Sequence, residues 1–124
     1  MRDTDALVIG AGPAGLACAA VLGRHGLHAS ILEKASTVGA VWRRHYDRLH
    51  LHTDRGHSGL PGLPMPRGYP RYPSRAQVVA YLESYAAHFG LRPEFGSAAL
   101  AVLRTEHGWR VETPTRAWNA PIVV

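Results

Sequence analysis

The sequence contains few of the features that mark secreted or membrane-bound proteins. Its single cysteine, Cys18, excludes an internal disulfide and is typical of a reducing compartment. The N-terminal segment lacks the charge and cleavage pattern of a signal peptide, and no apolar run approaches the length needed to span a membrane. We therefore predict a soluble, cytoplasmic protein with no membrane partner. Cys18 is best interpreted as a small apolar residue on a buried helix face rather than as a reactive thiol.

Several kinds of functional site are also missing. No two carboxylates have the spacing expected for acid–base catalysis, and no Ser-His-Asp arrangement can be identified. The net charge is +5, but the arginines are not interleaved with a stacking platform, so nucleic-acid binding is not predicted. An anionic cofactor would explain a local excess of positive charge equally well. With 124 residues, 46% of them apolar, the chain can form one modest domain with a core.

The strongest signal is a glycine motif near the N-terminus. Residues 6–9 form a short apolar run, which predicts a buried parallel strand. Gly10, Gly12 and Gly15 follow it in the pattern Gly-x-Gly-x-x-Gly. In this pattern the first glycine makes a tight turn, the second lets a pyrophosphate approach the backbone, and the third lets a helix pack close to the strand. Pro13 suits the first turn of that helix, whose amides and dipole favour an anion.

The context of the motif supports this interpretation. Gly26 is placed to end the helix in a left-handed cap, and residues 27–32 predict a second strand. Glu33 follows about twenty residues after the glycines, where a carboxylate accepts hydrogen bonds from a ribose diol. The same carboxylate would repel a 2′-phosphate, so the adenosine half is not expected to be that of NADP. The alternative is a glycine-rich turn between ordinary core elements, which the agreement of strand, helix, second strand and acid disfavours.

The middle of the chain predicts an irregular loop and a helix. Residues 43–73 are punctuated by proline and glycine but carry enough aromatic and aliphatic residues to be ordered, and we expect them to lie against the cofactor. Residues 74–89 then show the spacing of a helix with one apolar stripe. Ser74 and Gln77 match a capping box, which explains Gln77 better than a cofactor contact does.

The C-terminal part predicts strands. Segments 98–105 and 109–113 are typical of a hairpin, and residues 116–124 begin a further strand. The sequence stops on an apolar run with no loop or polar tail, so we expect the chain to be a fragment of a longer protein.

Basic residues gather at the start of the long loop, and two interpretations stay open for them. They could supply charge for a phosphate or diphosphate, or they could be a solvated surface. A metal site formed by His50, His52 and His57 is disfavoured, because this stretch contains no cysteine and Asp47 and Asp54 are its only close carboxylates. Trp42 could stack near a ring system or belong to the loop core. The basic residues are Arg43, Arg44, His45, Arg48, His50, His52, Arg55 and His57.

The order of these motifs resembles a known family. The chain is similar, over essentially its whole length, to the N-terminal part of class B flavin monooxygenases, in particular the flavin-containing branch with the plant YUCCA-type enzymes and their bacterial relatives. The glycine motif alone indicates only a dinucleotide, and the Gly-x-x-Trp-Arg and Leu-His-Thr stretches make the likeness specific. The segments that carry it are 10–15, 33–34, 39–43, 46–53, 72–77, 81–86, 89–91 and 108–111.

The resemblance implies a Rossmann-like α/β fold, with a parallel sheet, helices and a β-hairpin or meander near the C-terminus, that binds FAD. It also implies that NADPH reduces the flavin and that O₂ adds at flavin C4a, giving a hydroperoxide that oxygenates a small organic substrate. Glycines 10 to 15 would hold the pyrophosphate, Glu33 the ribose, and residues 41–43 with 52–53 the flavin side. The implied cofactor-binding residues are Gly10, Ala11, Gly12, Pro13, Ala14, Gly15, Glu33, Lys34, Val41, Trp42, Arg43, His52 and Thr53.

The sequence also departs from the family. It lacks the second glycine motif, which binds NADPH, the Phe-x-Gly-x-x-x-His signature before that motif, and the Ala-Thr-Gly that follows the family's Val-Val strand. We therefore expect residues 1–124 to be the N-terminal part of an FAD-binding domain, with NADPH bound by a part of the parent protein outside this chain. Two rival hypotheses are a non-catalytic flavin- or nucleotide-binding module and an inactive remnant that leaves a sheet edge open.

Overall fold

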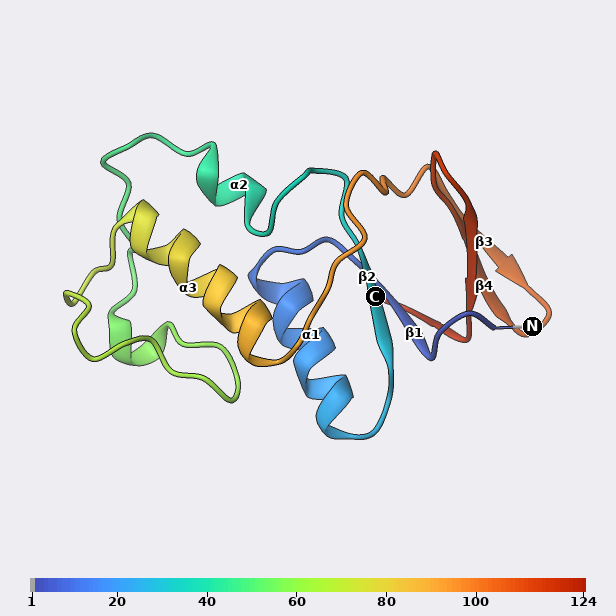
Figure 1. Ribbon diagram of the computed structural model, residues 1–124, viewed down its shortest axis with the longest axis horizontal. Coiled ribbons are helices and arrows are strands. Elements are labelled where there is room, and N and C mark those ends of the chain that lie inside the picture. The colour runs from blue at the N-terminus through green and yellow to red at the C-terminus, as the bar shows by residue number, and fades with distance from the viewer. Residues whose placement is uncertain (1) are drawn as a thin grey trace.

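A computed structural model describes residues 2–124, which form two three-stranded sheets, three α-helices and one 3₁₀ turn. Figure 1 shows the antiparallel sheet at one end of the molecule and helices α2 and α3 at the other. The parallel sheet and α1 lie between them. No helix within residues 2–124 has both the length and the apolar character needed to cross a bilayer.

The N-terminal third is a β-α-β unit built on the glycine motif. Strand β1 (Ala6–Ile9) leads into helix α1 (Pro13–Arg24), and strand β2 (Ala29–Leu32) returns parallel to β1. Gly26 has φ +80°, which confirms the left-handed residue expected after the helix. Strand β2 begins later than the predicted residue 27, because the amide of Leu27 bonds back to the carbonyl of Leu22 and so closes the helix.

The predicted second long helix is confirmed, including its cap. Helix α3 (Arg75–His88) begins after Ser74, whose hydroxyl accepts a hydrogen bond from the amide of Gln77. The Gln77 side chain in turn accepts one from the amide of Ser74 at 2.9 Å. The cap thus accounts for Gln77, as predicted. The buried side chains of α3 lie on one stripe that packs in the main core: Val78, Tyr81, Leu82, Tyr85 and Ala86.

The loop between Arg43 and Pro73 is ordered, as expected, but it packs mainly on α3. It contains one 3₁₀ turn, η1 (Arg55–His57). The Tyr81 hydroxyl accepts a hydrogen bond from the amide of Leu60 at 2.7 Å and donates one to the carbonyl of Leu63 at 2.5 Å. Tyr85 donates a third to the carbonyl of Pro61 at 2.6 Å. These hydroxyls satisfy backbone groups that a loop at the core would otherwise leave unpaired.

Two tyrosines of this loop, Tyr46 and Tyr72, are exposed rather than packed into the core. Tyr46 is 67% exposed and Tyr72 is 44% exposed, whereas Leu51, Leu60 and Leu63 are partly buried against the main core. The loop therefore meets the core through its leucines and presents part of its aromatic surface to solvent.

The C-terminal third is a meander followed by a change of sheet. Strands β3 (Ala101–Thr105), β4 (Gly108–Glu112) and β5 (Ala117–Ala120) pair antiparallel in sequence order, which confirms the predicted hairpin. The predicted strand from residue 116 is divided in two. After Pro121, strand β6 (Ile122–Val123) leaves the meander and pairs parallel with β1, giving the order β2-β1-β6.

The meander is fixed to the parallel sheet by a second, small core. Val111 and Ala120 are buried against Leu7 and Leu32. The central strands of the two sheets, β1 and β4, meet in this small core. Strand β4 therefore packs on one face of β1, and helix α1 packs on the opposite face, in the main core.

The outer edge of β2 is covered by the segment that follows α3. The amide of Glu94 donates to the carbonyl of Ile31 at 2.8 Å, and the amide of Glu33 donates to the carbonyl of Glu94 at 2.9 Å. The amide of Ser97 then donates to the carbonyl of Glu33 at 2.9 Å. This pairing brings residues 97–99 beside the end of β2, where the glycine motif also lies.

Candidate nucleotide-binding site

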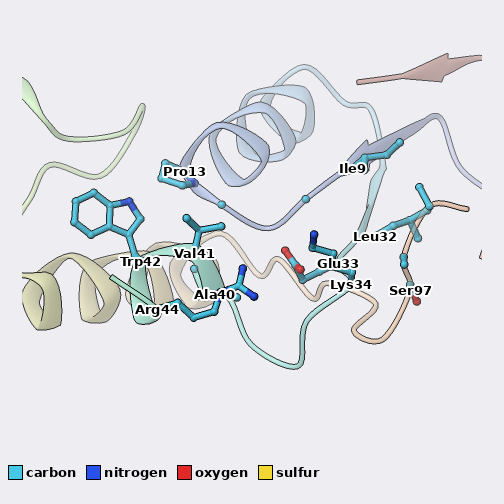
Figure 2. Close-up of a pocket in the computed structure, with 15 residues that line it drawn as sticks. Ile9, Pro13, Leu32, Glu33, Lys34, Ala40, Val41, Trp42, Arg44 and Ser97 are labelled. Carbon is cyan, nitrogen blue, oxygen red and sulfur yellow. The ribbon is translucent and has the colours of Figure 1, made fainter. Parts of the chain in front are cut away.

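A cleft of about 360 Å³ lies at the carboxyl ends of β1 and β2, where α1 begins. This is the edge at which open parallel sheets bind their ligands, and the volume falls at the small end of the range for small-molecule sites. Figure 2 shows the side chains that surround it. The lining residues are Ile9, Gly10, Gly12, Pro13, Leu32, Glu33, Lys34, Gly39, Ala40, Val41, Trp42, Arg44, Ser97, Ala98 and Ala99.

The three motif glycines occupy positions that suit the roles predicted for them. Gly10 has φ +105°, a conformation that side-chain-bearing residues rarely adopt. A Cβ on Gly12 would meet nothing within 4 Å, so this position leaves the backbone open toward the cleft. A Cβ on Gly15 would lie 1.9 Å from the carbonyl oxygen of Gly10, so the helix and strand can only approach this closely with glycine there.

The start of α1 faces the cleft without a protein cap. Its N-cap is Gly12, no side chain of the described residues caps it, and its first turn holds no acidic residue. Pro13, at the first helical position, has no N–H to satisfy. The positive end of the helix dipole is thus uncompensated by the protein side chains, and an anion of suitable size would be stabilised there.

Glu33 lies across the cleft floor from this helix start. Glu33 is only 8% exposed, and both oxygens of its carboxylate accept hydrogen bonds from backbone amides. Oε1 accepts from the amide of Ala11 at 2.9 Å, and Oε2 accepts from the amide of Ala35 at 2.8 Å. Each oxygen keeps a further lone pair, so the carboxylate can still accept hydrogen bonds from hydroxyl groups of a ligand.

Helix α2 (Ala40–Arg43) makes the opposite wall. It follows Gly39, which has φ +66° and donates its amide to the carbonyl of Ala11 at 3.1 Å. In Figure 2 Trp42 and Val41 stand at one end of the cleft, Ser97 stands near the other, and Glu33 lies between. Trp42 packs against the main core, as one of its two interpretations predicted, and it also lines the cleft. That it stacks near a ring system stays a prediction.

Other residues implied by the family resemblance lie outside this lining. Ala14 is in the first turn of α1, and Ala11 is fully buried behind the glycine turn. The guanidinium of Arg43 is directed to α3, where it forms an ion pair with Glu83. That these residues contact the cofactor stays a prediction.

The Leu-His-Thr stretch also lies apart from the cleft. His52 borders a separate shallow hollow together with His50, Arg71 and Tyr72. The hydroxyl of Thr53 is 2.6 Å from the hydroxyl of Ser58. Contact of His52 and Thr53 with a flavin therefore also stays a prediction.

The basic residues of the loop are dispersed rather than gathered into one phosphate site. Arg44 lines the cleft, while Arg55 donates to the backbone carbonyls of Arg67 and Tyr69 at 2.8 and 2.6 Å. The carboxylate of Asp54 accepts hydrogen bonds from the ring of His57 at 2.8 Å and from its backbone amide at 3.0 Å. These two hydrogen bonds hold the pKa of Asp54 below its ordinary value. Across residues 2–124, no group of three His, Cys, Asp or Glu side chains could hold a metal ion.

Sequence reasoning missed the third wall of the cleft, residues 97–99. These residues carry no motif, and they reach the cleft only because Glu94 pairs with β2. The signal that could have found them is the extended stretch after α3, which is able to add to an open sheet edge. Arg44, at the cleft rim, was predicted as part of the basic group but not as a site residue.

Comparison with known proteins gives matches over the same region. The family model described as pyridine nucleotide-disulphide oxidoreductase matches residues 7–124. An indole-3-pyruvate monooxygenase of the YUCCA group from Oryza sativa subsp. japonica is 50% identical over 93 residues, covering 74% of this chain and 23% of the relative. A probable indole-3-pyruvate monooxygenase of the same group from Arabidopsis thaliana is 43% identical over 114 residues, covering 90% of this chain and 26% of the relative.

A solved structure agrees with these matches. The flavin monooxygenase from Stenotrophomonas maltophilia, in a doubly substituted form, superposes with a TM-score of 0.91 at 35% identity. The superposition covers 99% of this chain and 37% of that protein. The chain thus spans about a quarter of the length of the curated relatives that it matches.

Proposed function

This chain belongs to the pyridine nucleotide-disulphide oxidoreductase family, among its class B flavin monooxygenases, and from that premise we propose that its cleft binds FAD through the adenosine diphosphate half. The observation that carries the proposal is the position of Glu33. Its buried carboxylate lies one hydrogen bond from the glycine turn, beside a helix start that no side chain caps.

The chemistry of the lining fits the parts of this ligand. The diphosphate would lie over the start of α1, at Gly12 and Pro13, where the dipole and the absent Cβ favour it. The ribose hydroxyls would donate to Glu33. The apolar surface of Ala98 and Ala99 would cover the adenine, and the flavin half would extend past Trp42.

For the protein to which this chain belongs we propose an NAD(P)H-dependent monooxygenase that acts on a small organic substrate with O₂. When bound, the flavin would supply the chemistry that activates O₂ with electrons from the nicotinamide. The residues described here would bind and orient the cofactor and keep water from its adenosine half. NADPH would be bound by residues outside this chain, since the sequence carries one glycine motif.

A second candidate function is a flavin- or nucleotide-binding module without turnover. It is favoured by one observation: the sequence carries the glycine motif at residues 10–15 but no second glycine motif for NADPH. The two candidates share the same binding site and differ in whether NADPH oxidation follows binding. Oxygen uptake by the full-length parent protein loaded with FAD, measured with and without NADPH, separates them.

The binding proposal is tested by titrating the purified chain with FAD, with ADP and with riboflavin, which lacks the adenosine diphosphate. We expect FAD to bind, ADP to compete with it, and riboflavin to bind at least about tenfold more weakly, because one or two charge-assisted hydrogen bonds are lost with the adenosine half. Equal binding of FAD and riboflavin, or failure of ADP to compete, would contradict the proposed orientation. A chain that takes up neither FAD nor ADP would overturn the proposal altogether.

A further inference from the structure

Helix α2 supplies a wall of the cleft but has little means of holding its own position. It has only four residues, none of which is buried, and Val41 is 60% exposed. A single helical turn is not stable in isolation, because fixing the first turn costs more conformational freedom than its few hydrogen bonds return. The position of Val41 and Trp42 must therefore come from contacts made by the rest of the protein.

One such contact begins at the last residue of α2. The guanidinium of Arg43 forms an ion pair with the carboxylate of Glu83 on α3. Its Nε also donates to the carbonyl of Val38 at 3.3 Å, on the segment that leads into α2. The Arg43 side chain thus joins both α3 and the entry to its own helix.

A second contact comes from the first turn of α3. Arg75 donates through Nη1 to the backbone carbonyl of Arg43 at 2.6 Å, and its Nη2 lies 3.3 Å from Oδ1 of Asp47. A cation at the carboxyl end of a helix is also favourable for the helix dipole. We call the four residues Arg43, Glu83, Arg75 and Asp47 the α2 clamp.

The beginning of α2 is fixed separately. The amide of Gly39 donates to the carbonyl of Ala11, in the glycine turn, and a Cβ on Gly39 would lie 3.0 Å from Cδ1 of Leu82 on α3. Helix α2 is therefore tied at its start to the diphosphate end of the cleft and at its end to α3. Figure 2 shows Ala40, Val41 and Trp42 close together on one side of the cleft.

From these contacts we infer that Glu83 and Arg75, which do not line the cleft, are positioning residues that set the flavin-facing wall through Arg43. The inference rests on the proposed function for the identity of the ligand, and on the contacts alone for the clamp. It assigns to the Arg43 side chain a structural role, which differs from direct contact with the cofactor. It further implies that the clamp affects binding of the flavin half and leaves the adenosine half unaffected.

The test uses the variant Glu83→Gln, which keeps the size of the side chain and removes its charge. We expect the Kd for FAD to rise about two- to fivefold, the range for loss of a half-exposed ion pair, while the Kd for ADP stays unchanged. Direct contact of Arg43 with the flavin predicts the opposite, because the freed guanidinium would be more available and FAD affinity would hold or increase. Glu106→Gln, on the exposed turn between β3 and β4, is the matched control.

Hydrogen exchange provides a readout that needs no ligand. The amides of Arg43, Arg44 and His45 bond to carbonyls within residues 39–42. In Glu83→Gln they should exchange about two- to fivefold faster than in the unchanged chain, with no change in α1. In the double variant R43Q/E83Q the second substitution should add nothing to R43Q, since each removes the same pair.

These measurements separate the failure of the inference from failure of the proposed function. Unchanged exchange at residues 43–45 in Glu83→Gln overturns the clamp, whatever binds in the cleft. Faster exchange together with equal weakening of FAD and ADP overturns its restriction to the flavin half. Faster exchange in a chain that binds neither nucleotide supports the clamp and rejects the FAD proposal.

Discussion

The carboxylate of Glu33 accepts a hydrogen bond from the backbone amide of Ala11 at 2.9 Å, although 22 positions separate the two residues in the chain. This bond connects the end of β2 to the turn that follows β1. Through this bond Glu33 becomes a structural member of the glycine turn. The shape of the turn and the position of the carboxylate at the ribose site therefore depend on each other.

Replacing Glu33 by glutamine should therefore affect both stability and binding. The new amide group can accept from one of the two backbone donors, at Ala11 and Ala35, but presents N–H groups to the other. We expect a loss of about 1–3 kcal/mol in the free energy of unfolding and at least about tenfold weaker FAD binding. Thermal unfolding and FAD titration measure the two effects. Unchanged values for both, in a variant that folds, would show that the carboxylate has no such role.

The same carboxylate should select against a 2′-phosphate. At a few ångströms in a partly buried site the repulsion between the two anions is at least about 1.4 kcal/mol. We thus expect adenosine 5′-monophosphate, which differs from adenosine 2′,5′-bisphosphate only by lacking the 2′-phosphate, to bind at least about tenfold more tightly than the bisphosphate. The preference should narrow in Glu33→Gln, where the charge is gone. Competition against a fluorescent nucleotide analogue gives both constants, and a preference that persists in the variant would point to a steric cause instead.

Two glycines of α1 allow a matched comparison of packing. A Cβ on Gly15 would lie 1.9 Å from the carbonyl oxygen of Gly10, whereas a Cβ on Gly23 would meet nothing within 4 Å. Gly15→Ala should destabilise the chain by about 1–3 kcal/mol through overpacking. Gly23→Ala should be neutral or stabilise it by up to about 1 kcal/mol, since alanine is the better helix former. Chemical unfolding of both variants tests the contrast, and equal effects would contradict the close approach of helix and strand.

The tyrosines that hold the long loop predict an alkaline limit of stability. Burial raises the pKa of Tyr81, against a smaller effect of the hydrogen bond from Leu60, and burial together with the neighbouring Tyr81 raises the pKa of Tyr85. A group with a raised pKa in the folded state stabilises fully below its unfolded pKa, about 10 for tyrosine, and loses that contribution as the pH rises through the folded pKa.

Stability should thus fall above about pH 10 more steeply in the unchanged chain than in the variant Tyr81→Phe. The variant should also be less stable at neutral pH, because the amide of Leu60 and the carbonyl of Leu63 lose their partner. Urea unfolding at pH 7, 9, 10 and 11 measures both differences. Parallel curves for the two proteins would mean that Tyr81 ionises normally in the folded state.

The parts of the fold that could be predicted are those determined by residues near each other in the chain. The strand–glycine–helix unit, the capping box of Ser74 and Gln77, and the hairpin around residues 106–107 were all predictable, and the structure confirms them. Each depends on contacts within a few residues, where spacing alone carries the information.

What could not be predicted depends on pairing between distant segments. The cleft wall at residues 97–99 exists because Glu94 adds to β2, and the Arg43 side chain turns to α3 because Glu83 stands opposite it. The last strand is likewise divided at Pro121, because β5 before it pairs with β4 and β6 after it pairs with β1 of the other sheet. No local pattern encodes these choices, since each segment would satisfy its hydrogen bonds with either partner.

The pairing of β6 with β1 has a consequence for how the chain acquires its structure during synthesis. Ala6 and Leu7 leave the ribosome well before Ile122 and Val123, with which they pair in the parallel sheet. One side of the central strand therefore waits, unpaired, while more than a hundred residues are translated. An early β-α-β unit exposed in this way is a natural binding site for chaperones, and slowing translation should lengthen its period of vulnerability to aggregation.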